Sequence, residues 1–253
     1  MRQTSALSQT DCCLWHDPST LGAEHWPLHP NVAQYHTTPL NFEMVPGAET
    51  TAVGMSLVSG ALGHTAVQAD ETVTANQHME MSNSYSTTET TDFPADTDGM
   101  SSFQVWYLDS ATTTSNGACC GNNISYGRTS GTSNTDIQHY SSDKVVTHTG
   151  QQDNWLAMGA SYAYDDDATG SQGYPGSTDG TPAVYFYCND DTMQAVDDSA
   201  ATSFGVQNFV NWDAADGSCQ MLEQVVFKHP LTIEETTELK KYFQFKYGDA
   251  FDD

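Results

Sequence analysis

The densest set of candidate metal ligands in the chain is a run of three aspartates that a fourth follows. Asp165, Asp166 and Asp167 stand directly before an Ala-Thr-Gly stretch, and Asp179 precedes a glycine further along the chain. Ca²⁺ is bound by roughly six to eight hard oxygen atoms, which loops of aspartates and backbone carbonyls supply. We therefore expect these four residues to form a Ca²⁺ site, with a merely solvated acidic loop as the alternative.

Tyrosines in loop-like surroundings offer a second kind of chemistry, because an aromatic ring presents a broad apolar face and a polar tip. Tyr126, Tyr140 and Tyr174 are flanked by Gly, Ser, Asn and Pro. We predict that these three tyrosines form a ligand-binding surface at the rim of the domain, where they would stack on sugar rings. Trp15 and Trp155 lie in strand-like runs, so we assign them to the core.

The six cysteines do not have the spacing of a zinc or redox site, since none of them forms a Cys-x-x-Cys pair. They are Cys12, Cys13, Cys119, Cys120, Cys188 and Cys219. We interpret them as small buried hydrophobic residues, although their even number permits disulfides.

Three histidines, His25, His29 and His36, have spacings that would place them on one helix as metal ligands. Pro27 and Pro30 lie among them, and proline inside a helix removes a hydrogen bond and clashes with the preceding turn. We expect residues 17–50 to be an irregular, proline-rich loop without a histidine site.

From about residue 51 the chain consists of short β-prone runs that Gly, Asn, Asp and Ser separate. Many short strands with turn signals between them predict an all-β sandwich or barrel. The expected strands are residues 52–58, 64–68, 77–85, 101–109, 122–127, 135–140, 143–148, 154–164, 182–189, 203–210 and 219–228.

The last of these strands has apolar residues on both of its faces. Alternation predicts that Met221, Glu223, Val225 and Phe227 share one face and that Leu222, Gln224 and Val226 share the other. Each face has one polar residue among apolar ones, which indicates a strand that is covered on both sides.

A helix over residues 231–248 is expected to follow. Thr232 and Glu235 have the spacing of a capping box, in which each side chain satisfies a free backbone amide of the first turn. Gly248 is the expected stop.

The closing segment Leu-Glu-Gln-Val-Val-Phe, Pro-Leu-Thr, Glu-Glu and Lys-Tyr-Gly resembles the end of concanavalin A-like and laminin-G-like domains. The segment Cys13-Leu-Trp-His-Asp-Pro-Ser19 is similar to their opening strand. The resemblance implies one domain over residues 1–253, an antiparallel two-sheet jelly-roll sandwich with one short C-terminal helix. Lectins, glycosidases and structural modules all use this fold, so the resemblance does not fix an activity.

In the laminarinase branch of this fold the catalytic carboxylates lie on one strand as Glu-x-Asp-x-x-Glu or Glu-x-Asp-x-Glu, and the chain has neither pattern. Asp70 and Glu71 are adjacent and would face opposite sides of a strand, and Glu80 has no acidic partner two residues away. We therefore predict that the chain is not an enzyme, with glycoside hydrolase as a remote alternative.

Charge excludes one class of partner. The chain of 253 residues has 33 acidic residues against seven Lys and Arg, a net charge of −26. Such a surface repels phosphate backbones, which argues against nucleic-acid binding, and it suits a marine or saline medium. We find no apolar run of about 18 residues, so we expect no membrane span.

These observations together favour a structural or recognition module. Residues 1–11 have no apolar region of the length found in secretory signals. We expect a virion surface protein, used for capsid decoration or as a turret or tail fibre, that also adheres to glycans. It would be oligomeric or part of an assembly, with other virion or surface proteins and host glycans as partners. A secreted or cell-surface carbohydrate-binding protein is the alternative.

Overall fold

The computed structural model describes sixteen segments of the chain, and the account below concerns these alone. They are residues 12–22, 26–33, 44–46, 56–69, 79–86, 99–108, 118–119, 124–128, 135–139, 144–148, 154–163, 183–188, 194–197, 205–208, 219–227 and 229–248.

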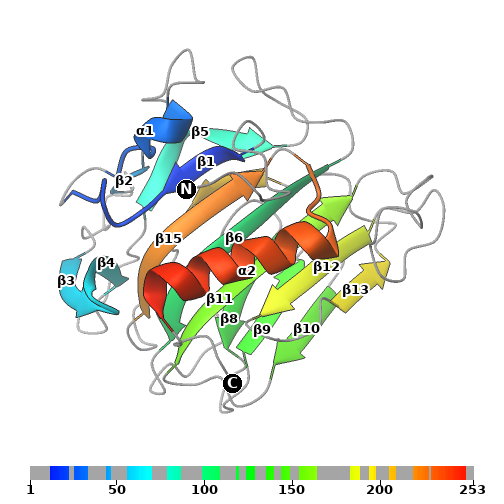
Figure 1. Cartoon of the computed structure of the whole chain (residues 1–253). Helices are drawn as coiled ribbons and strands as arrows, with labels where there is room; N and C mark the ends of the chain where they lie inside the picture. The colour runs from blue at the N-terminus through cyan, green and yellow to red at the C-terminus, as the bar shows by residue number, and fades with distance from the viewer. Residues whose placement is uncertain are drawn as a thin grey trace.

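The described strands form three antiparallel sheets, and one C-terminal helix lies across the largest of them (Figure 1). The eight-stranded sheet has the order β13-β12-β11-β6-β15-β4-β3, and β1 pairs with β15 beside this path. The two smaller sheets have the orders β10-β9-β8-β7 and β14-β5-β2. This is the predicted fold class, an antiparallel all-β sandwich with one short C-terminal helix.

The elements of the eight-stranded sheet are β1 (Cys12–His16), β3 (Ser56–Ala61), β4 (His64–Ala69), β6 (Gly99–Leu108), β11 (Trp155–Ala163), β12 (Ala183–Cys188), β13 (Gln194–Asp197) and β15 (Cys219–Phe227). The smaller sheets contain β2 (Met44–Pro46), β5 (Met79–Ser86), β7 (Ala118–Cys119), β8 (Ile124–Arg128), β9 (Thr135–His139), β10 (Lys144–His148) and β14 (Gly205–Asn208). The helices are α1 (Pro30–Ala33) and α2 (Ile233–Tyr247).

Helix α2 covers one face of the large sheet because one side of it is apolar. Leu239, Phe243 and Tyr247 follow each other at intervals of four residues, and all three are buried. They pack in one cluster with residues of β6 and β15, including Phe103 and Val225. Burial of side chains of this size contributes about 1.5–3 kcal/mol each relative to exposure, so this contact is a main source of the helix's stability.

The ends of α2 are those that the sequence predicts. The Thr232 hydroxyl accepts a hydrogen bond from the Glu235 amide at 3.2 Å, and the Glu235 carboxylate accepts one from the Thr232 amide at 2.9 Å. At the other end Gly248 has a φ of 79° and donates its amide to the Gln244 carbonyl. A residue with a side chain would be strained at this φ, so glycine suits the position.

The pairing of β15 with β6 corrects one prediction. Met221 pairs with Trp106 and Glu223 pairs with Val105, so Leu222 is an extra residue between two consecutive pairs. This bulge places Met221 on the opposite face from Glu223, whereas strict alternation put them together. Leu222 instead belongs to the cluster under α2. Nothing in the local sequence marks the extra residue.

Both faces of β15 are nevertheless buried, as predicted. On the face away from α2, Met221, Gln224 and Val226 are all at most 1% exposed. The Gln224 side chain accepts a hydrogen bond from the Gln104 amide at 3.1 Å, directly across the strand pair. The central strand of the sheet therefore lies within a core on both sides.

The proline-rich stretch, residues 17–50, contains two short elements, α1 and β2, which the sequence analysis did not expect. Helix α1 starts at Pro30, where proline is tolerated because the first amides of a helix need no intrahelical acceptor. It contains none of the three candidate histidines, and His25 and His36 lie outside the described residues. Trp26, which lies in this stretch, is fully buried.

Gly159 is a point at which the large sheet should not tolerate a larger residue. A Cβ atom at Gly159 would lie 2.0 Å from Cδ1 of Phe103, its paired residue on β6. We expect Gly159→Ala to lower the free energy of unfolding by about 1–3 kcal/mol, as overpacking does. Urea denaturation of G159A, F103L and the double variant measures this. The Phe103→Leu background should reduce the cost of G159A, and an equal cost in both backgrounds would contradict the proposed clash.

Candidate functional site

Most of the residues predicted to bind a ligand or metal lie outside the described segments. This holds for Tyr140, Tyr174 and the four aspartates Asp165, Asp166, Asp167 and Asp179. Within the described part of the chain, no group of three or more His, Cys, Asp and Glu side chains is placed to hold a metal ion. The predicted Ca²⁺ site therefore stays a prediction.

Tyr126 is the one predicted binding residue that falls in a described element. It lies on β8, where it pairs with Ala118 of β7 on one side and Ile137 of β9 on the other. Ile137 in turn pairs with Val146 of β10. Tyr126 thus lies on an inner strand of a sheet, within the strand predicted over residues 122–127, in a row with three apolar residues.

The largest cluster of polar side chains in the described structure is centred on Glu223 of β15, which is fully buried. Its Oε1 accepts hydrogen bonds from Trp15 Nε1 at 2.6 Å and from the Tyr242 hydroxyl at 2.7 Å. Its Oε2 accepts hydrogen bonds from Lys246 Nζ at 2.8 Å and from the Tyr247 hydroxyl at 2.5 Å. Each carboxylate oxygen therefore has two donors, which fills its acceptor capacity.

Lys246 connects this carboxylate to a second one. Its Nζ lies 2.8 Å from Glu223 Oε2 and 2.9 Å from Asp17 Oδ2, and it also donates to the Tyr242 hydroxyl at 2.9 Å. The side chains of Lys246 and Asp17 are only 17% and 8% exposed, so the charges are largely shielded from water. The ammonium group also lies over the rings of Trp15, Tyr242 and Tyr247, at 5.8, 5.4 and 5.3 Å from their centroids.

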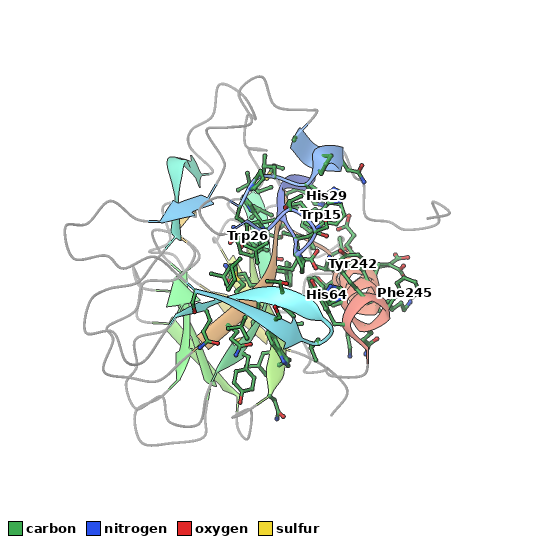
Figure 2. All side chains as sticks on the ribbon, turned by 90° about the vertical axis from the view of Figure 1, so that its left-hand side faces the viewer. Trp15, Trp26, His29, His64, Tyr242 and Phe245 are labelled. Atoms are coloured by element: carbon green, nitrogen blue, oxygen red, sulfur yellow. The ribbon has the colours of Figure 1, made fainter. Side chains whose placement is uncertain are left out.

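Asp17 brings the segment that follows β1 into the same cluster. Its Oδ1 accepts a hydrogen bond from the Ser19 amide at 3.0 Å, and its backbone carbonyl accepts one from Trp26 Nε1 at 2.9 Å. The chain then returns to β1, where the His29 ring stacks on Trp15 at 3.9 Å between centroids (Figure 2). The cluster thus joins the start of the described chain to its final helix.

Burial and charge act together on the two tyrosines. Burial raises the pKa of both Tyr242 and Tyr247, and the negative charge of Glu223 raises it further. Both hydroxyls therefore stay protonated at neutral pH and remain hydrogen-bond donors to the carboxylate.

This arrangement stabilises the fold and does not form a catalytic site. Asp17 and Glu223 are bridged by one ammonium group, so the two carboxylates are close in space. However, Glu223 is 0% exposed and Asp17 is 5% exposed, and both are engaged by donors from the protein itself. A general acid or nucleophile must reach its substrate, and these two groups do not.

Sequence reasoning missed the cluster. It identified Glu223 as a polar residue among apolar ones on the last strand, which is the only local signal. Trp15 and Asp17 are more than 200 positions away from their partners on β15 and α2, and no periodicity connects them. The two cysteines of β1 are buried thiols, as interpreted, and each donates to a backbone carbonyl.

Comparison with known proteins identifies the fold only. No protein-family model and no curated protein matches the chain. Among solved structures, the binding domain of Paraclostridial Mosquitocidal Protein 1 aligns with a TM-score of 0.53 and 8% identity, over 93% of this chain and 53% of that one. The binding domain of botulinum neurotoxin DC in complex with SialylT aligns with a TM-score of 0.57 and 8% identity, over 94% and 52%.

A third structure comes from a description of cell entry by botulinum neurotoxin type C that depends on two ganglioside molecules. It aligns with a TM-score of 0.55 and 8% identity, over 93% of this chain and 52% of that one. The chain thus spans about half the length of the structures it matches. In the part of the chain that the structure describes, no helix is long and apolar enough to cross a membrane.

Two lysines of α2 test whether the buried cluster is important for stability. Lys246→Met leaves two buried carboxylates without their cation, so we expect a loss of about 3–5 kcal/mol in the free energy of unfolding. Lys241→Met is the matched control, because Lys241 pairs with Glu238 at the same 2.8 Å but is 63% exposed. It should cost about 0.5 kcal/mol or less. Equal losses in urea denaturation would refute the assignment.

The cluster also predicts a pH dependence. Burial acts to raise the pKa of Asp17, but hydrogen bonds from Ser19 and Lys246 outweigh it and hold the pKa below its ordinary value of 3.8. A carboxyl whose pKa is lowered in the folded state contributes stability that is present above 3.8 and lost as the pH falls through the folded-state pKa. Asp17→Asn should therefore be less stable than the wild type near neutral pH.

The difference in the free energy of unfolding between the wild type and Asp17→Asn should become smaller as the pH falls below 3.8. Urea unfolding at a series of pH values measures it. The pKa of Glu235 is also lowered, because hydrogen bonds from His229 and Thr232 outweigh its burial. Glu235 is present in both proteins, so the stability of the variant still depends on pH. A difference that stays constant over the whole pH range would show that the charge of Asp17 is unimportant.

Proposed function

We propose that this chain is a non-enzymatic recognition module that binds carbohydrate. The observation that carries the proposal is the shared fold, which extends over more than nine tenths of the chain in the toxin binding domains. Two of those structures are described by their glycan ligands, SialylT in one and gangliosides in the other. The concanavalin A-like or laminin-G-like class remains our proposal for the type of sandwich.

The chemistry of the described residues supports the non-enzymatic part of the proposal. The two carboxylates that share Lys246, Asp17 and Glu223, bind the protein's own donors and are shielded from water. They therefore contribute to stability and are not placed to act on a substrate.

We assign the glycan contacts to the three tyrosines Tyr126, Tyr140 and Tyr174. Tyr140 directly follows His139, which ends β9, and His139 pairs with Ile124 at the start of β8, the strand of Tyr126. The residue before Tyr140 thus lies on the strand next to that of Tyr126, which is compatible with a common binding surface. Asp165, Asp166, Asp167 and Asp179 would hold a Ca²⁺ ion that orders the adjoining loop.

The setting of the module is a further part of the proposal. A chain with a net charge of −26 stays soluble in saline media, because salt screens repulsion between its acidic groups. We propose the surface of a virion as its location, within an assembly that presents it to host glycans. A secreted or cell-surface protein is the alternative.

Glycan binding is tested directly with an array that includes sialylated and neutral oligosaccharides. We expect binding that Tyr140→Ala and Tyr174→Ala each weaken by roughly tenfold, because stacking on an aromatic ring contributes about 1 kcal/mol or more. Leu57→Ala is the matched control, since Leu57 is exposed on β3 in the eight-stranded sheet, whereas Tyr126 lies in the four-stranded sheet. Absence of binding to any glycan, or hydrolysis of a bound glycan, would contradict the proposal.

A further inference from the structure

The outward face of α2 is exposed along its whole length. Glu234, Thr237, Lys241 and Phe245 follow each other at helical spacing and are all exposed. Phe245 is 89% exposed, the largest value among the exposed large apolar side chains of the described residues. Figure 2 shows it on the side of the helix that points away from the sheet. An exposed aromatic ring on a regular helix is a feature of interaction surfaces.

The charges on this face are separated by sign. Glu234 and Glu238 lie in the first half of the helix, and Lys241 lies in the second half. Residues 229–248 contain three acidic residues and three lysines, so this segment is neutral in a chain whose net charge is −26. Two copies of the chain that met through α2 would therefore meet at a segment without net charge, where their mutual repulsion is reduced.

We propose that the outward face of α2 is the contact between two copies of this chain, which pack their helices antiparallel about a two-fold axis. In an antiparallel pair the acidic half of each helix faces the basic half of the other, so the surface complements itself. An axis midway between Glu238 and Lys241 places each Glu238 opposite Lys241 of the second copy. The same register places each Phe245 ring against the first turn of the opposite helix, near Glu234.

The ion pair between Lys241 and Glu238 within one helix does not prevent Lys241 from pairing with Glu238 of a second copy. Lys241 donates to Glu238 of its own helix at 2.8 Å, but the lysine side chain is 63% exposed. Exposed pairs of this kind have a small net effect on stability because water competes for both partners. Lys241 can therefore change partners at little cost when a second helix approaches.

The size of the face sets the strength of the contact. A helix of 15 residues is about 22 Å long, and a single strip of this length buries less than the roughly 1,200 Å² of a stable interface. We therefore expect a weak, reversible dimer with a dissociation constant on the order of 0.1 mM. Physiological salt assists it, because repulsion between the acidic surfaces is screened beyond about 8 Å.

Other occupants fit the face less well. An anionic membrane or an acidic peptide would be repelled by Glu234 and Glu238, and a basic peptide would be repelled by Lys241. A surface whose two halves carry opposite charges is best matched by a copy of itself in the reverse direction.

Charge reversal of each half provides the test. Lys241→Glu leaves only acidic groups on the face, and Glu238→Lys replaces the acidic partner of Lys241 with a second lysine. Sedimentation velocity from about 10 µM to 1 mM should show that each variant associates at least tenfold more weakly than the wild type. An equimolar mixture of the two variants should form a heterodimer at least as strong as the wild-type dimer.

Two controls separate this arrangement from a general effect of charge. The two variants change the net charge by equal amounts in opposite directions, so a general effect would make the Glu238→Lys variant associate more strongly than the wild type. That result would overturn the proposal, as would a wild-type chain that is monomeric at 1 mM or a mixture that does not associate. Leu57→Ser, which changes an exposed apolar residue on β3, should leave the association unchanged.

Discussion

The structure depends on how the chain accommodates one buried carboxylate. Glu223 lies on the central strand of the large sheet with no access to water, where an unpaired charge would cost several kcal/mol. Four donors offset this cost, and they come from two elements at opposite ends of the described chain, β1 and α2. Because the donors must all be in place together, the positions of β1 and α2 on β15 are coupled.

Lys246 extends this coupling to the segment after β1. Its ammonium group lies between Glu223 and Asp17, and Asp17 organises the turn that brings Trp26 into the core. A buried ion pair adds little to stability compared with apolar residues, but the removal of one partner is strongly destabilising. Its contribution here is to specify a single position for the helix and for the N-terminal segment.

Local patterns in the sequence predicted the local parts of this arrangement. Thr232, Glu235 and Gly248 fix the ends of α2 through interactions within a few residues, so their types and spacing were sufficient. The strand runs were also correct in type, because alternation and turn residues are local signals. The bulge at Leu222 was missed, since it depends on how β6 pairs with β15 and not on the residue itself. For the same reason the sequence did not indicate that Trp26, within the stretch expected to be an irregular loop, is buried.

The candidate sites show the same difference between local signals, which the sequence contains, and long-range contacts, which it does not. The sequence could identify acidic and aromatic residues with suitable chemistry, but it could not indicate that Asp17, Glu223 and Lys246 come together, because that contact exists only in the folded sheet. The consequence is that the two carboxylates that share Lys246 contribute to the stability of the fold.

Native-state hydrogen exchange of the wild-type protein tests the central claim most directly. If the Glu223 cluster fixes both ends of the described chain on the sheet, the amides of α2, β1 and β15 open as one cooperative unit with the same free energy. Exchange from α2 at a much lower free energy than from β15, with β15 still protected, would contradict the account, because it would show that the helix leaves the sheet without disturbing the buried carboxylate.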